Sequence, residues 1–282
     1  MIQAVNYSIT KFFDFFLYPF RFLSDFWGIL FLSILVSLVV LIIYKYVSSP
    51  QKIKQAKNQI KSSILGIRLY KDFWKVITGS FLRSLFYTLK YFILNFGPVL
   101  IIIPILFPLF VQMDVRYGMR PFKPGEVFAV KAAFNANVND LKIDMLENKQ
   151  FQPVMNPVFI NAYRDENRTI PIREVNWKLK MTGEGTTDIL IRVNDRVFDK
   201  SLVSGKYSGA LSNKKFEKSS IEHFIYPVEK LLAGSQYLKS ISIRYPSKSV
   251  SFLGIRTHWL VYHLILVLII VLALRKRFGV EF

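Results

Sequence analysis

The segment FWGILFLSILVSLVVLIIYKYVSSPQKIKQAKNQIK, residues 26–61, decides the fold because an apolar run passes directly into a basic one. Its first part, residues 26–44, contains no Asp, Glu, Lys or Arg and has about the length that a helix needs to cross a bilayer. Residues 91–113 and 257–274 have the same character. Because lipid cannot hydrogen-bond to open backbone groups, each run is expected to be helical. We therefore predict a membrane protein with three transmembrane helices, at 26–46, 91–113 and 257–274.

The basic loop that follows the first span sets the expected orientation. Residues 45–90 carry ten Lys or Arg side chains and one acid, Asp72. Loops of this composition beside a span are retained in the cytoplasm. The prediction is a multi-pass protein of a bacterial cytoplasmic (inner) membrane, with the N-terminus outside and a cytoplasmic tail at 275–282. Helical periodicity within residues 47–90 predicts a basic cytoplasmic helical hairpin, with its turn either at Gly66 or within 70–72.

The net charge of +19 is concentrated beside the predicted spans. The 45–90 loop contributes +9, and the much longer segment 114–256 contributes +8. Two effects account for most of this charge: basic loops beside spans are retained in the cytoplasm, and they are attracted to anionic membrane lipid. The ribosome is a further partner that such a loop could bind, and no DNA partner is expected. The cations expected to make cytoplasmic contacts are Lys52, Lys54, Lys57, Lys61, Arg68, Lys71 and Lys75.

The first 25 residues predict an aromatic-rich amphipathic helix. Val5, Ile9, Phe12 and Phe16 share one helical face, which is typical of a helix lying in the membrane interface. The alternative is a packing collar around the spans. The segment has no basic start and no small-residue cleavage site, so it is not expected to be a cleaved signal.

Residues 114–256 predict an extracytoplasmic β-rich domain. Alternating apolar residues are typical of strands at 127–134, 138–146, 177–181, 187–193, 197–203 and 241–245. Several short strands with frequent turns indicate a β-sandwich-like domain, immunoglobulin-like in pattern only. Residues 219–232 could form a helix or a long connection. Because the chain has no cysteine, this domain must hold together through its core. The predicted fold class is thus an α+β membrane protein.

The second predicted span is rich in residues that disturb helices. Gly97, Pro98, Pro104 and Pro108 all fall within it. Proline removes a backbone donor and kinks a helix, so a bend or break is expected near the cytoplasmic end.

Four polar side chains within the spans are candidates for function. His263 is ionisable, and such groups inside a membrane are candidates for a proton or ligand role; the alternative is a neutral His bonded to a headgroup, water or a neighbouring helix. Ser33, Ser37 and Asn95 could line a wet client groove, or could simply help the spans pack. No phosphate-binding loop, nucleophile elbow or zinc-binding His pair occurs in the sequence. No catalysis, cofactor or metal is therefore expected.

The order of span, basic hairpin, proline-rich span and third span resembles the YidC/Oxa superfamily of membrane insertases. Asn95-Phe96-Gly97-Pro98, leading to Pro104 and Pro108, is similar to the entry of the span after the hairpin in YidC-like proteins. The resemblance covers about residues 26–113 and could extend to the third span. It implies a groove between the spans in which a client segment loses water before it enters lipid.

The chain also departs from that pattern. Bacterial YidC-like insertases commonly have five core spans and a groove arginine, whereas this chain has three spans without Lys or Arg inside them, as in the reduced members. Its outer domain also falls where the family usually has a short connection. Two hypotheses follow: an insertase-like or chaperone-like factor with membrane proteins as clients, or a structural or assembly subunit whose outer domain binds a protein partner.

Overall fold

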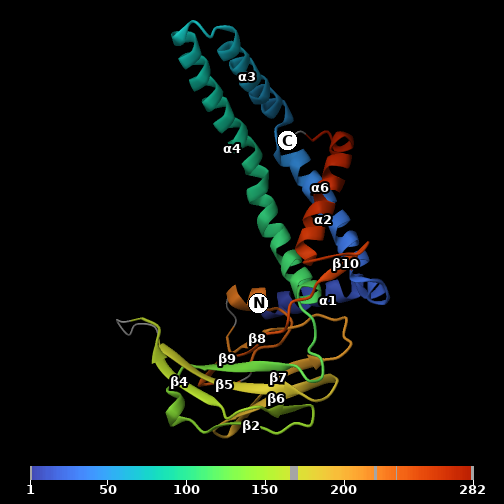
Figure 1. Cartoon of the computed structure of the whole chain (residues 1–282), viewed down its shortest axis with the longest axis vertical. Coiled ribbons are helices and arrows are strands. Elements are labelled where there is room, and N and C mark those ends of the chain that lie inside the picture. The colour runs from blue at the N-terminus through green and yellow to red at the C-terminus, as the bar shows by residue number, and fades with distance from the viewer. Residues whose placement is uncertain (1, 166–170, 219–220, 233, 281–282) are drawn as a thin grey trace. The chain divides into compact units, whose positions relative to one another are not determined.

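The computed structural model describes residues 2–165, 171–218, 221–232 and 234–280. It is a mixed α+β structure (Figure 1). The chain divides into two compact units. We call them the β-unit, Met1–Phe26 with Pro108–Trp259, and the helical unit, Trp27–Phe107 with Leu260–Phe282.

Among the described residues, three helices are long and apolar enough to cross a membrane, as expected from the sequence, and their insertion in a membrane stays a prediction. They are α2 (Asp25–Val47), α4 (Trp74–Met113) and α6 (Trp259–Phe278). Helix α6 continues four residues past the predicted end at 274, because Arg275, Lys276 and Arg277 form its last turn. Cations are favourable at that end of a helix, where the carbonyl groups are exposed.

Helix α4 is a single 40-residue helix, so the second span is not broken at its prolines, whereas the expected bend stays a prediction. The helix runs without interruption through Gly97, Pro98 and Pro104. Each proline removes one donor from the backbone ladder, and the bonds of the adjoining turns keep the helix intact. Its end passes into a wide π-type turn, η2 (Asp114–Gly118), within the β-unit.

Helices α3 (Pro50–Leu69) and α4 form a hairpin within the helical unit (Figure 1). The turn lies between the helices, where the Phe73 amide donates to the Tyr70 carbonyl at 3.0 Å. Of the two predicted turn positions, the 70–72 region is therefore correct. Gly66 instead lies against α4, where an added Cβ would meet Ser80 Oγ at 3.0 Å. The glycine permits the close approach of the two helices.

Among the described residues, the β-unit contains two main antiparallel sheets and, besides them, one two-stranded hairpin. The order of the larger sheet is β3 (Phe151–Pro153), β5 (Pro171–Met181), β1 (Val127–Phe134), β9 (Leu238–Ile243) and β8 (Lys214–Phe216), and β4 (Val158–Tyr163) also pairs with β5. The smaller sheet contains β2 (Ile143–Met145), β6 (Gly185–Val193) and β7 (Arg196–Ser204). The remaining elements are a short helix, α5 (Ile221–Ile225), and a hairpin of β10 (Val250–Phe252) and β11 (Ile255–Thr257).

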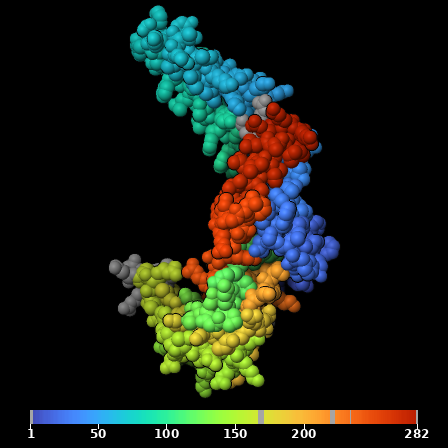
Figure 2. All heavy atoms as spheres, turned by 45° about the vertical axis from the view of Figure 1, so that its right-hand side comes forward, coloured from blue at the N-terminus to red at the C-terminus, as the bar shows by residue number. Residues whose placement is uncertain are grey.

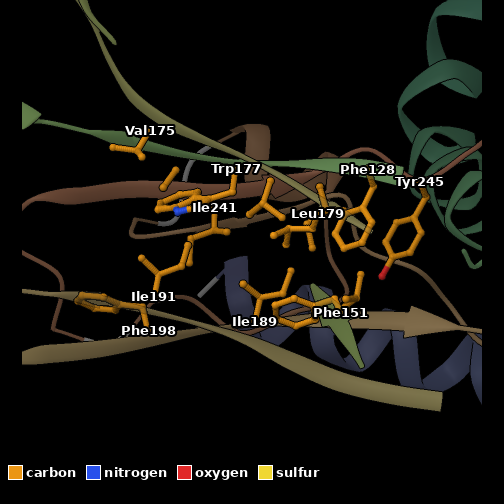
Figure 3. Packing of buried hydrophobic residues seen from close by; sticks show 14 of the residues in the cluster. Phe128, Phe151, Val175, Trp177, Leu179, Ile189, Ile191, Phe198, Ile241 and Tyr245 are labelled. Atoms are coloured by element: carbon orange, nitrogen blue, oxygen red, sulfur yellow. The ribbon is translucent and has the colours of Figure 1, made fainter. Parts of the chain in front are cut away.

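One hydrophobic core lies between the two sheets (Figure 3). Trp177 and Ile241 project from the larger sheet, and Ile189, Ile191 and Phe198 from the smaller one. Trp177, Ile189, Ile191 and Phe198 alternate with less buried residues along their strands, as expected when one face of a sheet is buried. The β-sandwich-like interpretation agrees with this arrangement.

Some strand predictions fail where local contacts replace the ladder. A strand was expected over 138–146, but the chain forms a 3₁₀ turn, η3 (Val138–Asp140), and only β2 is extended. The Asn137 side chain accepts from the Asn139 amide at 3.0 Å and so favours the turn. In the segment 219–232, whose first two residues lie outside the described ranges, the chain forms the short helix α5.

The N-terminal helices pack within the β-unit. Helix α1 (Ile2–Phe16) is followed by a 3₁₀ helix, η1 (Tyr18–Phe22). The side of α1 that is turned toward the domain includes polar residues, because Asn6 and Thr10 are buried. The Asn6 amide donates to the His223 carbonyl at 2.9 Å. Aromatic side chains remain exposed on the other side, among them Phe12, Phe15, Phe16 and Phe22. An interfacial position for this aromatic side stays a prediction.

A fully buried lysine stabilises the β-unit through polar contacts. The Lys200 ammonium donates to the Ser212 carbonyl at 2.7 Å and forms an ion pair with Glu229. Burial lowers the pKa of Lys200, and the charge of Glu229 opposes that change. Removal of one partner would therefore leave a buried charge without compensation.

We expect Lys200→Met to lower the free energy of unfolding by about 3 kcal/mol, because Glu229 loses its partner. Replacing both residues, Lys200→Met with Glu229→Leu, should recover most of that loss. The control Lys214→Met disrupts the more exposed pair with Glu222 and should cost no more than about 1 kcal/mol. Thermal unfolding of the full chain in detergent micelles, followed by tryptophan fluorescence, measures all three. Equal losses for Lys200→Met and Lys214→Met would contradict this account.

Candidate functional site

The structure brings together two of the predicted intramembrane residues, Ser33 of α2 and His263 of α6. Ser33 Oγ lies 2.8 Å from His263 Nδ1, and both residues are buried. The same hydroxyl donates to the Ile29 carbonyl at 2.7 Å. Since a serine has one hydroxyl proton, this assignment makes Nδ1 of His263 the donor to Ser33. The pair is a polar link between two apolar helices of the helical unit.

Ser37 extends this link along α2 rather than across to another helix. Its hydroxyl donates to the Ser33 carbonyl at 2.7 Å, and its side chain is fully buried. Serine commonly bonds to the carbonyl four residues earlier in a helix, which satisfies the hydroxyl locally. Ser33 and Ser37 therefore lie inside the helix packing in this structure.

Asn95 lies at a different level of the helical unit. Its side-chain amide donates to the Tyr91 carbonyl at 2.8 Å, and its own carbonyl accepts from the Tyr44 hydroxyl at 3.1 Å. Tyr44 is eleven residues beyond Ser33 on α2, which corresponds to about 16 Å along the helix. The three predicted groove residues thus occupy two separate depths.

The predicted cytoplasmic contact residues all lie exposed on the α3–α4 hairpin. Three of them, Lys54, Lys57 and Lys61, line one cavity together with Arg275 and Lys276 from the end of α6. The other four do not line that cavity and lie elsewhere on the hairpin: Lys52, Arg68, Lys71 and Lys75.

A polar junction in the β-unit was not predicted from the sequence. The Arg116 guanidinium is buried and donates to Asp14 Oδ1 at 2.8 Å and to the Thr10 carbonyl at 3.2 Å. Gln112 donates to Thr10 Oγ1 at 3.0 Å. The spacing of Asn6, Thr10 and Asp14, four residues apart, is a polar stripe that could have indicated this contact. The junction joins α1 to the turn after α4.

Over the part of the chain that the structure describes, no group of three His, Asp or Glu residues could hold a metal ion. The ring of His263 is hydrogen-bonded to Ser33.

Comparison with known proteins gives no match: no family model, no curated protein and no solved structure matches this chain. The similarity to YidC/Oxa insertases therefore rests on the sequence pattern.

A double-mutant cycle of Ser33→Ala and His263→Leu should give a coupling energy of about 0.6 kcal/mol, with an upper limit near ~2 kcal/mol. Each single change leaves the other polar atom without its cross-helix partner. Thermal unfolding in micelles supplies the four stabilities. Ser37→Ala provides the control. The Ser37 hydroxyl donates to the Ser33 carbonyl within α2, so this change should show no coupling energy with His263→Leu. A coupling energy of zero between Ser33 and His263 would show that their contact contributes nothing.

Proposed function

We propose that this chain is a non-enzymatic, insertase-like or chaperone-like factor of a bacterial cytoplasmic membrane, which handles segments of other membrane proteins. The observation that carries the proposal is the succession of α2, the basic α3–α4 hairpin, the apolar half of α4, and α6. In this orientation the hairpin is cytoplasmic and could meet nascent chains or ribosomes, while the β-unit is extracytoplasmic.

The polar contact between α2 and α6 supports this proposal energetically. Hydrogen bonds between helices within membranes average only about 0.6 kcal/mol. The Ser33–His263 bond could therefore exchange with a polar group of an arriving segment at little cost. Such an exchange would give a client a temporary partner before it enters lipid.

The exposed apolar surface of α4 provides room for a client helix. Leu100, Ile103 and Ile105 are each about half-exposed in the structure. Their side chains are as apolar as lipid tails, so a client helix and a lipid molecule could replace one another on this surface with a small change in free energy.

Site-specific photocrosslinking tests the proposal. A crosslinker at Ile34, which is exposed beside Ser33, leaves the Ser33–His263 bond in place. Together with a crosslinker at Asn95, it should capture newly made membrane proteins during their synthesis. A crosslinker at Ile269, exposed on α6, is the matched control and should capture mainly lipid. Capture of only stable, long-lived neighbours at Ile34 and Asn95 would contradict the proposal.

The second candidate function is a structural or assembly subunit, and edge strand β4 favours it. Within the described sheet, β4 pairs with β5 alone. Phe159 and Tyr163 share one face of this strand and are about half-exposed. Apolar side chains on an unpaired strand edge are typical of a surface that pairs with another protein.

Under this second function, Phe159→Glu with Tyr163→Glu should remove co-purifying subunits from the native membrane. Charges on this face would oppose burial against a partner. The control Val127→Glu with Val197→Glu introduces two charges at similarly exposed positions on other strands and should retain the subunits. Unchanged thermal unfolding of both variants would show that the β-unit is intact. If both variants retain every partner, β4 is not the contact surface.

A further inference from the structure

A basic cavity of about 520 Å³ lies between α3 and the end of α6. Its polar lining is Lys54, Lys57, Asn58 and Lys61 from α3, with Arg275 and Lys276 from α6. Among the described lining residues none is acidic. Figure 2 shows the surface where the red end of α6 meets the blue atoms of α3, and both elements belong to the helical unit.

The end of α6 is held in place by a glycine cap. Gly279 has φ +67°, a left-handed conformation that glycine adopts without strain. The next amide, that of Val280, donates to the Arg275 carbonyl at 3.0 Å, and the Val280 side chain is buried. This turn fixes the last turn of the helix, so the backbone that carries Arg275 and Lys276 is ordered.

Helix α3 presents three lysines to the same cavity. Lys54, Lys57 and Lys61 follow helical spacing on one side, whereas Ile53 and Ala56 are buried. Like charges one turn apart repel and destabilise a helix. Arg275 and Lys276 are favourable where they lie, because the exposed carbonyl groups at the end of α6 attract positive charge. The three lysines of α3 add their charge to the same cavity from the opposite wall.

We propose that this cavity binds a phosphate-bearing anion, and that its source is the headgroup of an anionic phospholipid. Lysine and arginine are the usual partners of phosphate oxygens, and the Asn58 amide adds a neutral donor. The cavity lies within one turn of Leu274, at the end of an apolar helix. That end is where a lipid headgroup lies when acyl chains cover the helix, and basic pockets between membrane helices bind such headgroups.

The test uses the full chain in neutral detergent micelles with dioleoyl-phosphatidylglycerol, dioleoyl-phosphatidylcholine or inorganic phosphate as separate probes. Native mass spectrometry counts the bound molecules, and thermal unfolding reports the stabilisation. We expect the triple variant Lys54→Gln, Lys57→Gln and Lys61→Gln to bind phosphatidylglycerol about tenfold more weakly, or weaker still. The matched control is Lys52→Gln, Arg68→Gln and Lys71→Gln, which removes the same charge from the hairpin outside the cavity. It should change binding by less than about twofold.

The outcomes separate the sources of the anion. Preference for phosphatidylglycerol over phosphatidylcholine, lost only in the cavity variant, supports the lipid site. Binding of inorganic phosphate without a preference between the two lipids would support a phosphate-binding cavity. The ligand would then be a free anion rather than a lipid headgroup. Equal weakening in both triple variants would overturn the proposal, because the attraction would then be diffuse. Unchanged phosphatidylglycerol binding in the cavity variant would overturn it as well, even if that variant lost ribosome binding.

Discussion

The helical unit depends on one constraint: a polar group surrounded by apolar side chains must find its hydrogen-bond partner within the protein. The hydroxyls of Ser33 and Ser37 meet it by bonding to backbone carbonyls one turn earlier, and so does the amide of Asn95. The imidazole of His263 reaches Ser33 on another helix. This cross-helix bond favours the packing of these faces of α2 and α6 against each other.

The β-unit meets the same constraint in another way. Its sheets satisfy the backbone, and the buried Lys200 is surrounded by carbonyl and carboxylate oxygens. Helix α1 covers the domain with a partly polar side, because Arg116 and Gln112 supply the partners for Thr10 and Asp14. Hydrophobic burial alone would place this helix the other way round.

Features with a local signal could be predicted from the sequence. The three apolar helices follow from runs without charge, and β1 has the predicted bounds because its alternation is complete over 127–134. The short strands β3 and β8 have three residues each, too few to show a period, and they exist because a neighbouring strand offers a ladder. Whether α4 is bent or broken at its prolines could not be decided from the sequence, since proline indicates a lost backbone donor but not the strength of the turns around it. The pairing of Ser33 with His263 depends on a tertiary contact that no local pattern contains. The polar stripe on α1 indicates that Asp14 has a polar partner, but it does not identify Arg116 as that partner.

The bond between Ser33 and His263 has a consequence for the order of assembly. The two residues are separated by 230 positions along the chain. At a synthesis rate of about 5 to 20 residues per second, α2 waits roughly 10 to 50 s before the histidine exists. During this interval Ser33 can bond only to its own helix or to a transient neighbour. The native contact between α2 and α6 is therefore a late event in biogenesis, and α6 completes a helix pair whose first member has long been synthesised.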